Sequence, residues 1–314
     1  MNRKRLKGVF SLLLVLMLCG CANQPPVKTP LPRAFVASFY PVYALAVNVV
    51  HDAPDRTLTC LTQPRDDCLR SYILSDWDIA LIARTDVLLI GGRGLESFEG
   101  ALQSMTESVP DAPAVISLMA NLTLINQGIV SADEDASHFQ GENPWLFLST
   151  KGAEEICAAI ALSLSSLDPE NAGLYEENRS DFAARMAILR AEMEEIIAPV
   201  RDQPVALMHE GLHYFAEEWA LNPVAVVERE PGMYFEDVEL DDVLQTLADS
   251  GARAVLLEMQ APMRLRRDLE RAGYAVVRID TLTTGITTGN LYAYEEAMRH
   301  NARALAMALQ ETRR

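Results

Sequence analysis

The chain alternates between short apolar runs and longer segments with helical spacing. Segments with helical spacing separate most of the runs, and examples are residues 43–50, 213–220, 241–248 and 263–272. Strands that alternate with helices pair in parallel, and helices cover their sheets. The pattern therefore predicts an α/β fold. The runs that we expect to form strands are Phe35 to Phe39, Val87 to Ile90, Ala114 to Ile116, Val205 to Met208, Val224 to Val227, Ala254 to Leu257 and Ala275 to Ile279.

The longest helical pattern lies in the middle of the chain, after a helix expected at residues 151–167. It begins with Asp168-Pro169-Glu170, a typical helix start, and ends before Pro199. We expect two similar α/β lobes with parallel sheets, at residues 34–167 and 200–314. One long rigid helix at 168–199 joins them, and a ligand cleft lies between them. One apolar stripe runs along that helix, at spacings of three and four, through Phe182, Met186, Leu189, Met193 and Ile196.

The first 20 residues have the features of a secretory signal peptide. Four basic residues between Arg3 and Lys7 precede an apolar run from Val9 to Leu18 that is too short to span a bilayer comfortably. The following Cys19-Gly20-Cys21 resembles a bacterial lipoprotein box in which Cys21 receives the lipid, and a plain membrane anchor is the alternative. Residues 21–33 contain four prolines and predict an extended tether. We therefore expect a lipoprotein on the extracytoplasmic face of the bacterial cell membrane.

Composition narrows the function further. The 314 residues carry a net charge of -17, and such an acidic surface repels phosphate backbones, which argues against nucleic acid as a partner. Five cysteines and five histidines are too few for a zinc-finger array or a disulfide-dense scaffold. Cys60 and Cys68 flank a polar turn in a chain expected to be exported, so a disulfide between them is one possibility and two reduced thiols are the other.

A series of short segments occurs in a specific order and spacing along the chain. The segments are Val36-Ala37-Ser38-Phe39-Tyr40-Pro41-Val42-Tyr43, Asp78-Ile79-Ala80, Asp86-Val87-Leu88-Leu89, Gly94-Leu95-Glu96, Leu167-Asp168-Pro169-Glu170-Asn171-Ala172, His209 with Tyr214-Phe215-Ala216-Glu217, Glu258-Met259-Gln260 and Met298-Arg299-His300-Asn301. Taken together, they resemble the substrate-binding lipoproteins of bacterial zinc and manganese ABC importers, the cluster A-I metal-binding family. The resemblance implies two lobes around a rigid helix, with a divalent metal between them as cargo. Zinc is the first expectation and manganese the second, and the implied partners are an ABC permease and its ATPase.

The resemblance assigns only part of a metal site to this chain. Two ligands fall on His209 and Asp280, and Glu258 resembles an acidic residue near the metal of zinc-binding members. The other two family positions, both histidine in the family, hold Arg70 and Trp145 here. Arginine cannot act as a ligand because it stays protonated.

Two further histidines could complete the site. His213 lies four residues after His209, and His138 lies on an acidic segment, 131–142, that we expect to be a surface loop. A half-buried helix residue is the plainer interpretation of His213.

Residues 209–213 also spell H-E-x-x-H, a motif that places two zinc ligands on one helix of a metallopeptidase. A strand-like run leads directly into His209, and Gly211 weakens a helix there, so this context does not fit a peptidase. We expect a monomeric solute-binding protein rather than an enzyme. A metal-free paralogue that binds another ligand or partner is the main alternative, and a zinc peptidase is the less favoured one.

Overall fold

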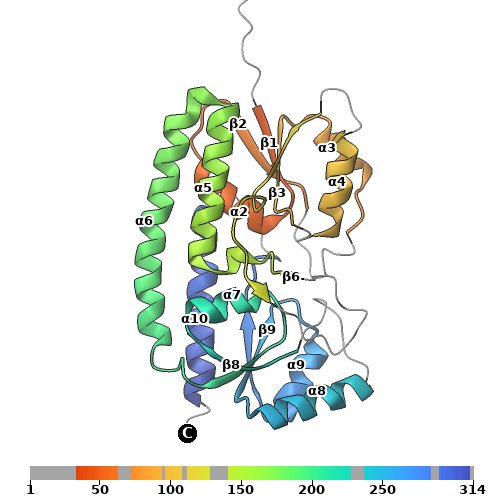
Figure 1. The fold of residues 1–314 in the computed structure, drawn as a ribbon, viewed down its shortest axis with the longest axis vertical. Coiled ribbons are helices and arrows are strands. Elements are labelled where there is room, and N and C mark those ends of the chain that lie inside the picture. Colours follow the sequence, from red (N-terminus) through yellow and green to blue (C-terminus); the bar gives the residue numbers. More distant parts are fainter. Residues whose placement is uncertain are drawn as a thin grey trace, which may run out of the picture. The chain divides into compact units, whose positions relative to one another are not determined.

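Four parallel strands form the sheet of the N-terminal half. They are β1 (Arg33–Ala37), β2 (Arg56–Cys60), β3 (Val87–Ile90) and β4 (Ala114–Ser117), in the order β2-β1-β3-β4. The computed structural model describes residues 33–62, 72–93, 96–107, 112–127, 141–227, 237–283 and 290–311. The helices of this half are α2 (Tyr40–Val50), α3 (Asp76–Ile82) and α4 (Ser97–Glu107), and α2 packs toward the long central helices while α3 and α4 lie on the other side of the sheet (Figure 1).

A second parallel sheet forms the C-terminal half. Its strands are β7 (Pro204–Leu207), β8 (Asn222–Val226), β9 (Ala254–Glu258) and β10 (Ala275–Ile279), in the order β10-β9-β7-β8. Its helices are α7 (Leu212–Glu218), α8 (Asp237–Ser250), α9 (Met263–Arg271) and α10 (Ala293–Glu311).

The two central strands of the second sheet, β7 and β9, are buried on both faces, whereas the edge strand β8 is largely exposed. Val205 and Leu207 pack into the main core, whereas Ala206 and Met208 pack into a second cluster with side chains of α8 and α9. This alternation follows from the two-residue period of a strand, and burial of both faces is typical of parallel sheets. The structure confirms the predicted α/β class with two parallel sheets.

One long helix, α6 (Ala172–Ile197), packs against helices of both halves. Helix α5 (Thr150–Leu167) is followed by the short 3-10 helix η3 (Pro169–Asn171) and by α6, which at 26 residues is about 39 Å long. Helix α6 packs against α5, α2 and α10 (Figure 1). The predicted stripe is buried, with its last fully buried member at Ile197 rather than at Ile196, which is only partly buried.

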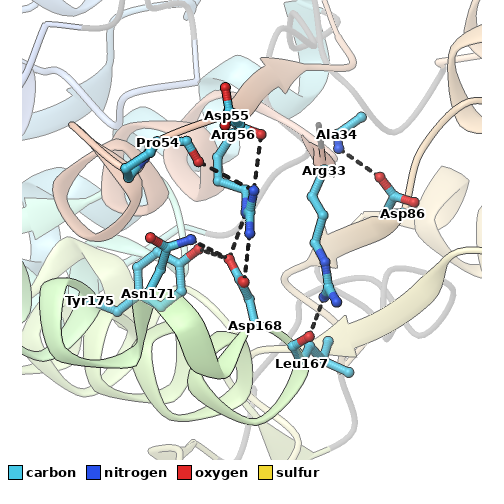
Figure 2. Close-up of polar contacts among 10 residues, drawn as sticks. All are labelled: Arg33, Ala34, Pro54, Asp55, Arg56, Asp86, Leu167, Asp168, Asn171 and Tyr175. Carbon is cyan, nitrogen blue, oxygen red and sulfur yellow. Dashed lines mark hydrogen bonds and ion pairs between the residues drawn. The ribbon is translucent and has the colours of Figure 1, made fainter. Parts of the chain in front are cut away.

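A buried ion pair fixes the start of α6 to the first sheet. The guanidinium of Arg56 donates two hydrogen bonds of 2.7 Å to the carboxylate of Asp168, which also accepts from the hydroxyl of Tyr175 and the amide of Asn171 (Figure 2). Nearby, the Arg33 guanidinium donates to the carbonyl oxygen of Leu167. The Asp-Pro-Glu segment expected to begin the long helix therefore also anchors it.

Several boundaries differ from the prediction for local reasons. Helix α2 begins at Tyr40 rather than at residue 43, because Pro41 is tolerated in a first helical turn. Strand β2 and helix α4 were not predicted. Within the expected surface loop 131–142, Gly141–Glu142 forms the strand β6, which pairs with β5 (Asn126–Gln127). The 3-10 helix η2 (Leu146–Leu148) leads into α5.

No helix in the described parts of the chain combines the length and apolar character needed to cross a bilayer.

Candidate metal site

Three predicted ligands follow the carboxyl ends of three neighbouring strands. His209 lies two residues beyond β7, Glu258 is the last residue of β9, and Asp280 comes directly after β10. The ladders pair Leu207 with Leu256 and Ile279 with Glu258, so the three residues lie at nearly the same level. Neighbouring strands are about 4.8 Å apart, and ligands of open α/β sheets bind at this edge.

The side chains do not converge into a complete site. Among the described residues, no three His, Cys, Asp or Glu side chains come together in a way that could hold a metal ion. Arg70 and His138 lie outside the described residues, as do Cys21 and Cys68.

His209 is buried, with 2% of its surface exposed. Its Nδ1 accepts a hydrogen bond of 3.0 Å from the backbone N–H of Gly211. An imidazole nitrogen that accepts a hydrogen bond carries no proton, so the ring is neutral and its proton is on Nε2. The lone pair that a metal would need is therefore already engaged with Gly211.

Trp145 covers this histidine. The two ring centroids are 4.4 Å apart, with the planes nearly perpendicular at 82°. A Cβ added to Gly211 would lie 2.7 Å from Cγ of Trp145, so only glycine fits against the indole. Trp145 is 2% exposed and its Nε1 has no hydrogen-bond partner among the described residues, which costs about 1–3 kcal/mol for a buried donor. The residue that replaces an expected ligand thus fills the space beside His209.

Hydrogen bonds join the segment around Trp145 to the segment that carries His209. The Asn143 amide donates to the carbonyl oxygen of Glu210 at 2.9 Å, and the Tyr214 hydroxyl donates to the carbonyl oxygen of Asn143 at 2.7 Å. Farther along, the Glu218 carboxylate accepts from the backbone N–H of Thr150 at 2.7 Å. The sequence had drawn attention to Tyr214 as part of a family segment, but it gave no indication of these contacts.

Asp280 is held by its own turn. Its Oδ1 accepts the backbone N–H of Leu282 at 2.8 Å, and its backbone N–H and carbonyl oxygen both bond to the side chain of Asn301. Leu282 has a φ of 65°, a strained value for leucine. Burial and the negative charge of Asp280 raise the pKa of Tyr40, so a residue of the first half lies near this carboxylate.

The remaining candidates differ in position. Glu258 is buried at the strand end. His213 lies near the start of α7, partly buried, and this burial lowers its pKa. Helix α7 begins at Leu212, so His209 precedes it. The two histidines of the H-E-x-x-H pattern do not share one helix, as a metallopeptidase motif requires.

One buried carboxylate of the first half was missed from the sequence. Glu99 accepts hydrogen bonds from the Ser38 hydroxyl at 2.5 Å and from the backbone N–H groups of Gly91 and Gly92 at 2.8 and 2.9 Å. Burial raises its pKa, and these hydrogen bonds partly offset that effect. Glu99 thereby ties together the chain segments that leave β1 and β3.

Cys60 is buried at the end of β2 and forms no disulfide with another cysteine in the described parts of the chain. Its Sγ lies 4.0 Å from the Thr62 hydroxyl, and burial raises its pKa to about 12. Because Cys68 lies outside the described residues, the disulfide between them stays a prediction.

Comparisons with known proteins agree on one family. The family model described as zinc-uptake complex component A, periplasmic (ZnuA), matches residues 35–308. The high-affinity zinc uptake system protein ZnuA of Paracoccus denitrificans is 29% identical over 175 residues, which are 54% of this chain and 52% of that protein. ZnuA of Bacillus subtilis is 22% identical over 290 residues, or 81% of this chain and 88% of that protein. The match thus spans about half the length of the Paracoccus relative.

Solved structures show the same fold. The solute-binding protein FpvC of Pseudomonas aeruginosa, in complex with Mn2+, aligns with a TM-score of 0.76 at 24% identity over 89% of this chain and 99% of that one. A crystal structure of ZnuA aligns with a TM-score of 0.71 at 19% identity, over 88% and 99% of the two chains. Because the family model covers most of the sequence, the chain belongs to the zinc-uptake complex component A (ZnuA) family.

Proposed function

We propose that this protein is a lipid-anchored extracytoplasmic receptor that captures a divalent transition-metal ion and delivers it to an ABC permease and its ATPase. Zinc is the first cargo and manganese the second, and the protein acts as a monomer without catalysing a reaction. The observation that carries the proposal is the placement of His209, Glu258 and Asp280 at the ends of three adjacent parallel strands.

The relatives support the choice of cargo. The curated relatives from Paracoccus and Bacillus are named as zinc uptake proteins, and the FpvC structures contain Mn2+ or Ni2+. The side chains assigned to the site of this chain are consistent with such cargo, since imidazole and carboxylate groups both bind these metals.

The donor set of this chain predicts weak and poorly selective binding. Zinc prefers about four ligands in a tetrahedron. His209, Glu258 and Asp280 offer one imidazole and two carboxylates, and the positions of two family histidines hold Arg70 and Trp145. Carboxylates favour harder cations such as Mn2+ more than imidazoles do, so the preference for zinc over manganese should be small.

Titration calorimetry of the mature protein with Zn2+ and Mn2+ tests this proposal. His209→Ala and Asp280→Asn should each abolish measurable binding of both metals. His300→Ala is the matched control, because His300 is exposed on α10, and it should bind like the parent. Equal binding by the parent and His209→Ala would contradict the assigned site.

One observation favours a second candidate, a metal-free paralogue on the same fold. Trp145 covers His209, whose Nδ1 lone pair is engaged by Gly211. The double variant Arg70→His/Trp145→His separates the two functions, because it restores two imidazoles. Zinc binding by the double variant but not by the parent would favour the paralogue, whereas binding by both, tighter in the variant, would favour the receptor.

A further inference from the structure

His209 cannot coordinate a metal in the orientation that the structure shows. Coordination uses a nitrogen lone pair, and the neutral ring has one, on Nδ1. The backbone N–H of Gly211 occupies that lone pair at 3.0 Å. To bind a cation, the imidazole must give up this hydrogen bond and turn.

Trp145 blocks that rotation. Its ring stands almost perpendicular to the imidazole at a centroid distance of 4.4 Å, and both side chains are 2% exposed. The same indole lies against Gly211, the residue that holds Nδ1. The histidine, its hydrogen-bond donor and the covering ring therefore form one packed unit.

We propose that Trp145 is a gate over His209: the indole must leave its place against His209 and Gly211 before the imidazole can turn and bind cargo. The inference deepens the proposed receptor function and rests on it. It makes Trp145 a residue that controls access to the site and is not itself a ligand.

The contacts of Trp145 suit a side chain that moves. In the buried position, its Nε1–H bonds to no residue that the structure describes, so an outward rotation breaks no such hydrogen bond and lets the indole gain one to water. The backbone of the segment is anchored separately, because Asn143 Oδ1 accepts the Trp145 N–H at 3.0 Å and the Asn143 amide holds Glu210. The ring can therefore swing while the segment stays in place.

Chemical modification tests the gate without any metal. Diethyl pyrocarbonate acylates accessible imidazoles, and His209 in the parent should react slowly because it is covered. Trp145→Ala should accelerate its modification. Gly211→Ala should also accelerate the modification of His209, because its added Cβ displaces the indole. In the double variant Trp145→Ala/Gly211→Ala, the rate should be close to that of Trp145→Ala alone, because both substitutions act by removing the same cover. Exposed His300 should react at the same rate in every variant.

Trp219→Ala is the matched control. Trp219 is also buried, and its Nε1 likewise has no hydrogen-bond partner within the described part of the chain, but it lies at the far end of α7. The Trp219→Ala substitution should leave the reactivity of His209 unchanged. Slow modification of His209 in Trp145→Ala would overturn the gate.

Fluorescence reports the movement itself. The protein has three tryptophans, so Trp77→Phe/Trp219→Phe leaves Trp145 as the single emitter. Zinc should shift its emission to the red as the indole enters water. Zinc should also associate faster with Trp145→Ala, by about tenfold if the open form makes up about a tenth of the parent population.

The outcomes separate the gate from the receptor function. If the parent binds zinc while Trp145 emission stays constant, or if Trp145→Ala binds no faster, the gate is wrong and the receptor function stands. If neither the parent nor Trp145→Ala binds zinc, the receptor function fails and the gate fails with it.

Discussion

At the scale of single residues, the ion pair between Arg56 and Asp168 makes the sharpest stability prediction. Both side chains are buried, at 6% and 2% exposure. Asp168→Ala leaves the Arg56 charge buried without its partner, so we expect the free energy of unfolding to fall by about 3–5 kcal/mol. Denaturant unfolding at neutral pH measures this change.

The pair Arg179–Glu176 on α6, in which the Glu176 side chain is 63% exposed, is the control. Glu176→Ala should lower the free energy of unfolding by at most about 1 kcal/mol, because surface ion pairs contribute little. Equal losses in the two variants would show that Asp168 is not a buried anchor.

The same pair gives a dependence on pH. The hydrogen bonds from Arg56 hold the pKa of Asp168 well below its usual range, although burial opposes them. The folded state therefore binds a proton at this group less readily than the unfolded chain does. Its contribution is complete at neutral pH and is lost as the pH falls below the ordinary aspartate range. The free energy of unfolding of the parent should fall between pH 5 and pH 3, and that of Asp168→Asn should fall less over the same range. Denaturant unfolding at a series of pH values measures this difference.

The sequence predicted individual site residues unevenly. The resemblance to the metal-binding family singled out His209, Glu258 and Asp280, and the apolar run before each placed it at a strand end, where parallel sheets bind ligands. The cover by Trp145 could not be predicted, since it joins residues 64 positions apart and depends on how two halves pack. Glu99 carries no local signal either, because its partners follow two other strands.

At the scale of elements, the long helix α6 packs against helices of both halves. Met186 is fully buried on it, whereas Ile188, two residues away, is 60% exposed. Met186→Asp would bury an unpaired carboxylate and should lower the free energy of unfolding by several kcal/mol. Ile188→Asp should change it by less than about 0.5 kcal/mol. An unchanged melting temperature for Met186→Asp would contradict the packing described for this helix.

Elements with a clear apolar pattern could be predicted from the sequence, whereas weakly patterned elements could not. Both faces of β3 and β9 are buried, so each is a continuous apolar run. Strand β2 reads Arg-Thr-Leu-Thr-Cys and is buried only at its last residue, which leaves no apolar run to recognise. Helix α4 contains Gly100 and several polar residues, and this composition hides its apolar face.

At the scale of the whole molecule, the proposed site of action depends on Cys21, which lies outside the described residues. Cys21→Ser should remove the lipid attachment site and yield a product that is unlipidated, uncleaved or mislocalised. The parent and Cys21→Ser can be compared by palmitate labelling and membrane fractionation of cells that express each protein. Identical labelling and fractionation of the variant and the parent would exclude the proposed anchor.

The central claim is that this chain still binds a transition metal between its halves. Elemental analysis of the mature, tag-free protein, purified without added metal, tests it most directly. If the protein is a metal receptor, zinc or manganese should copurify with the parent at no more than one ion per chain. The His209→Ala variant should contain neither metal. A parent with no more transition metal than the His209→Ala variant would contradict the account and leave the metal-free paralogue.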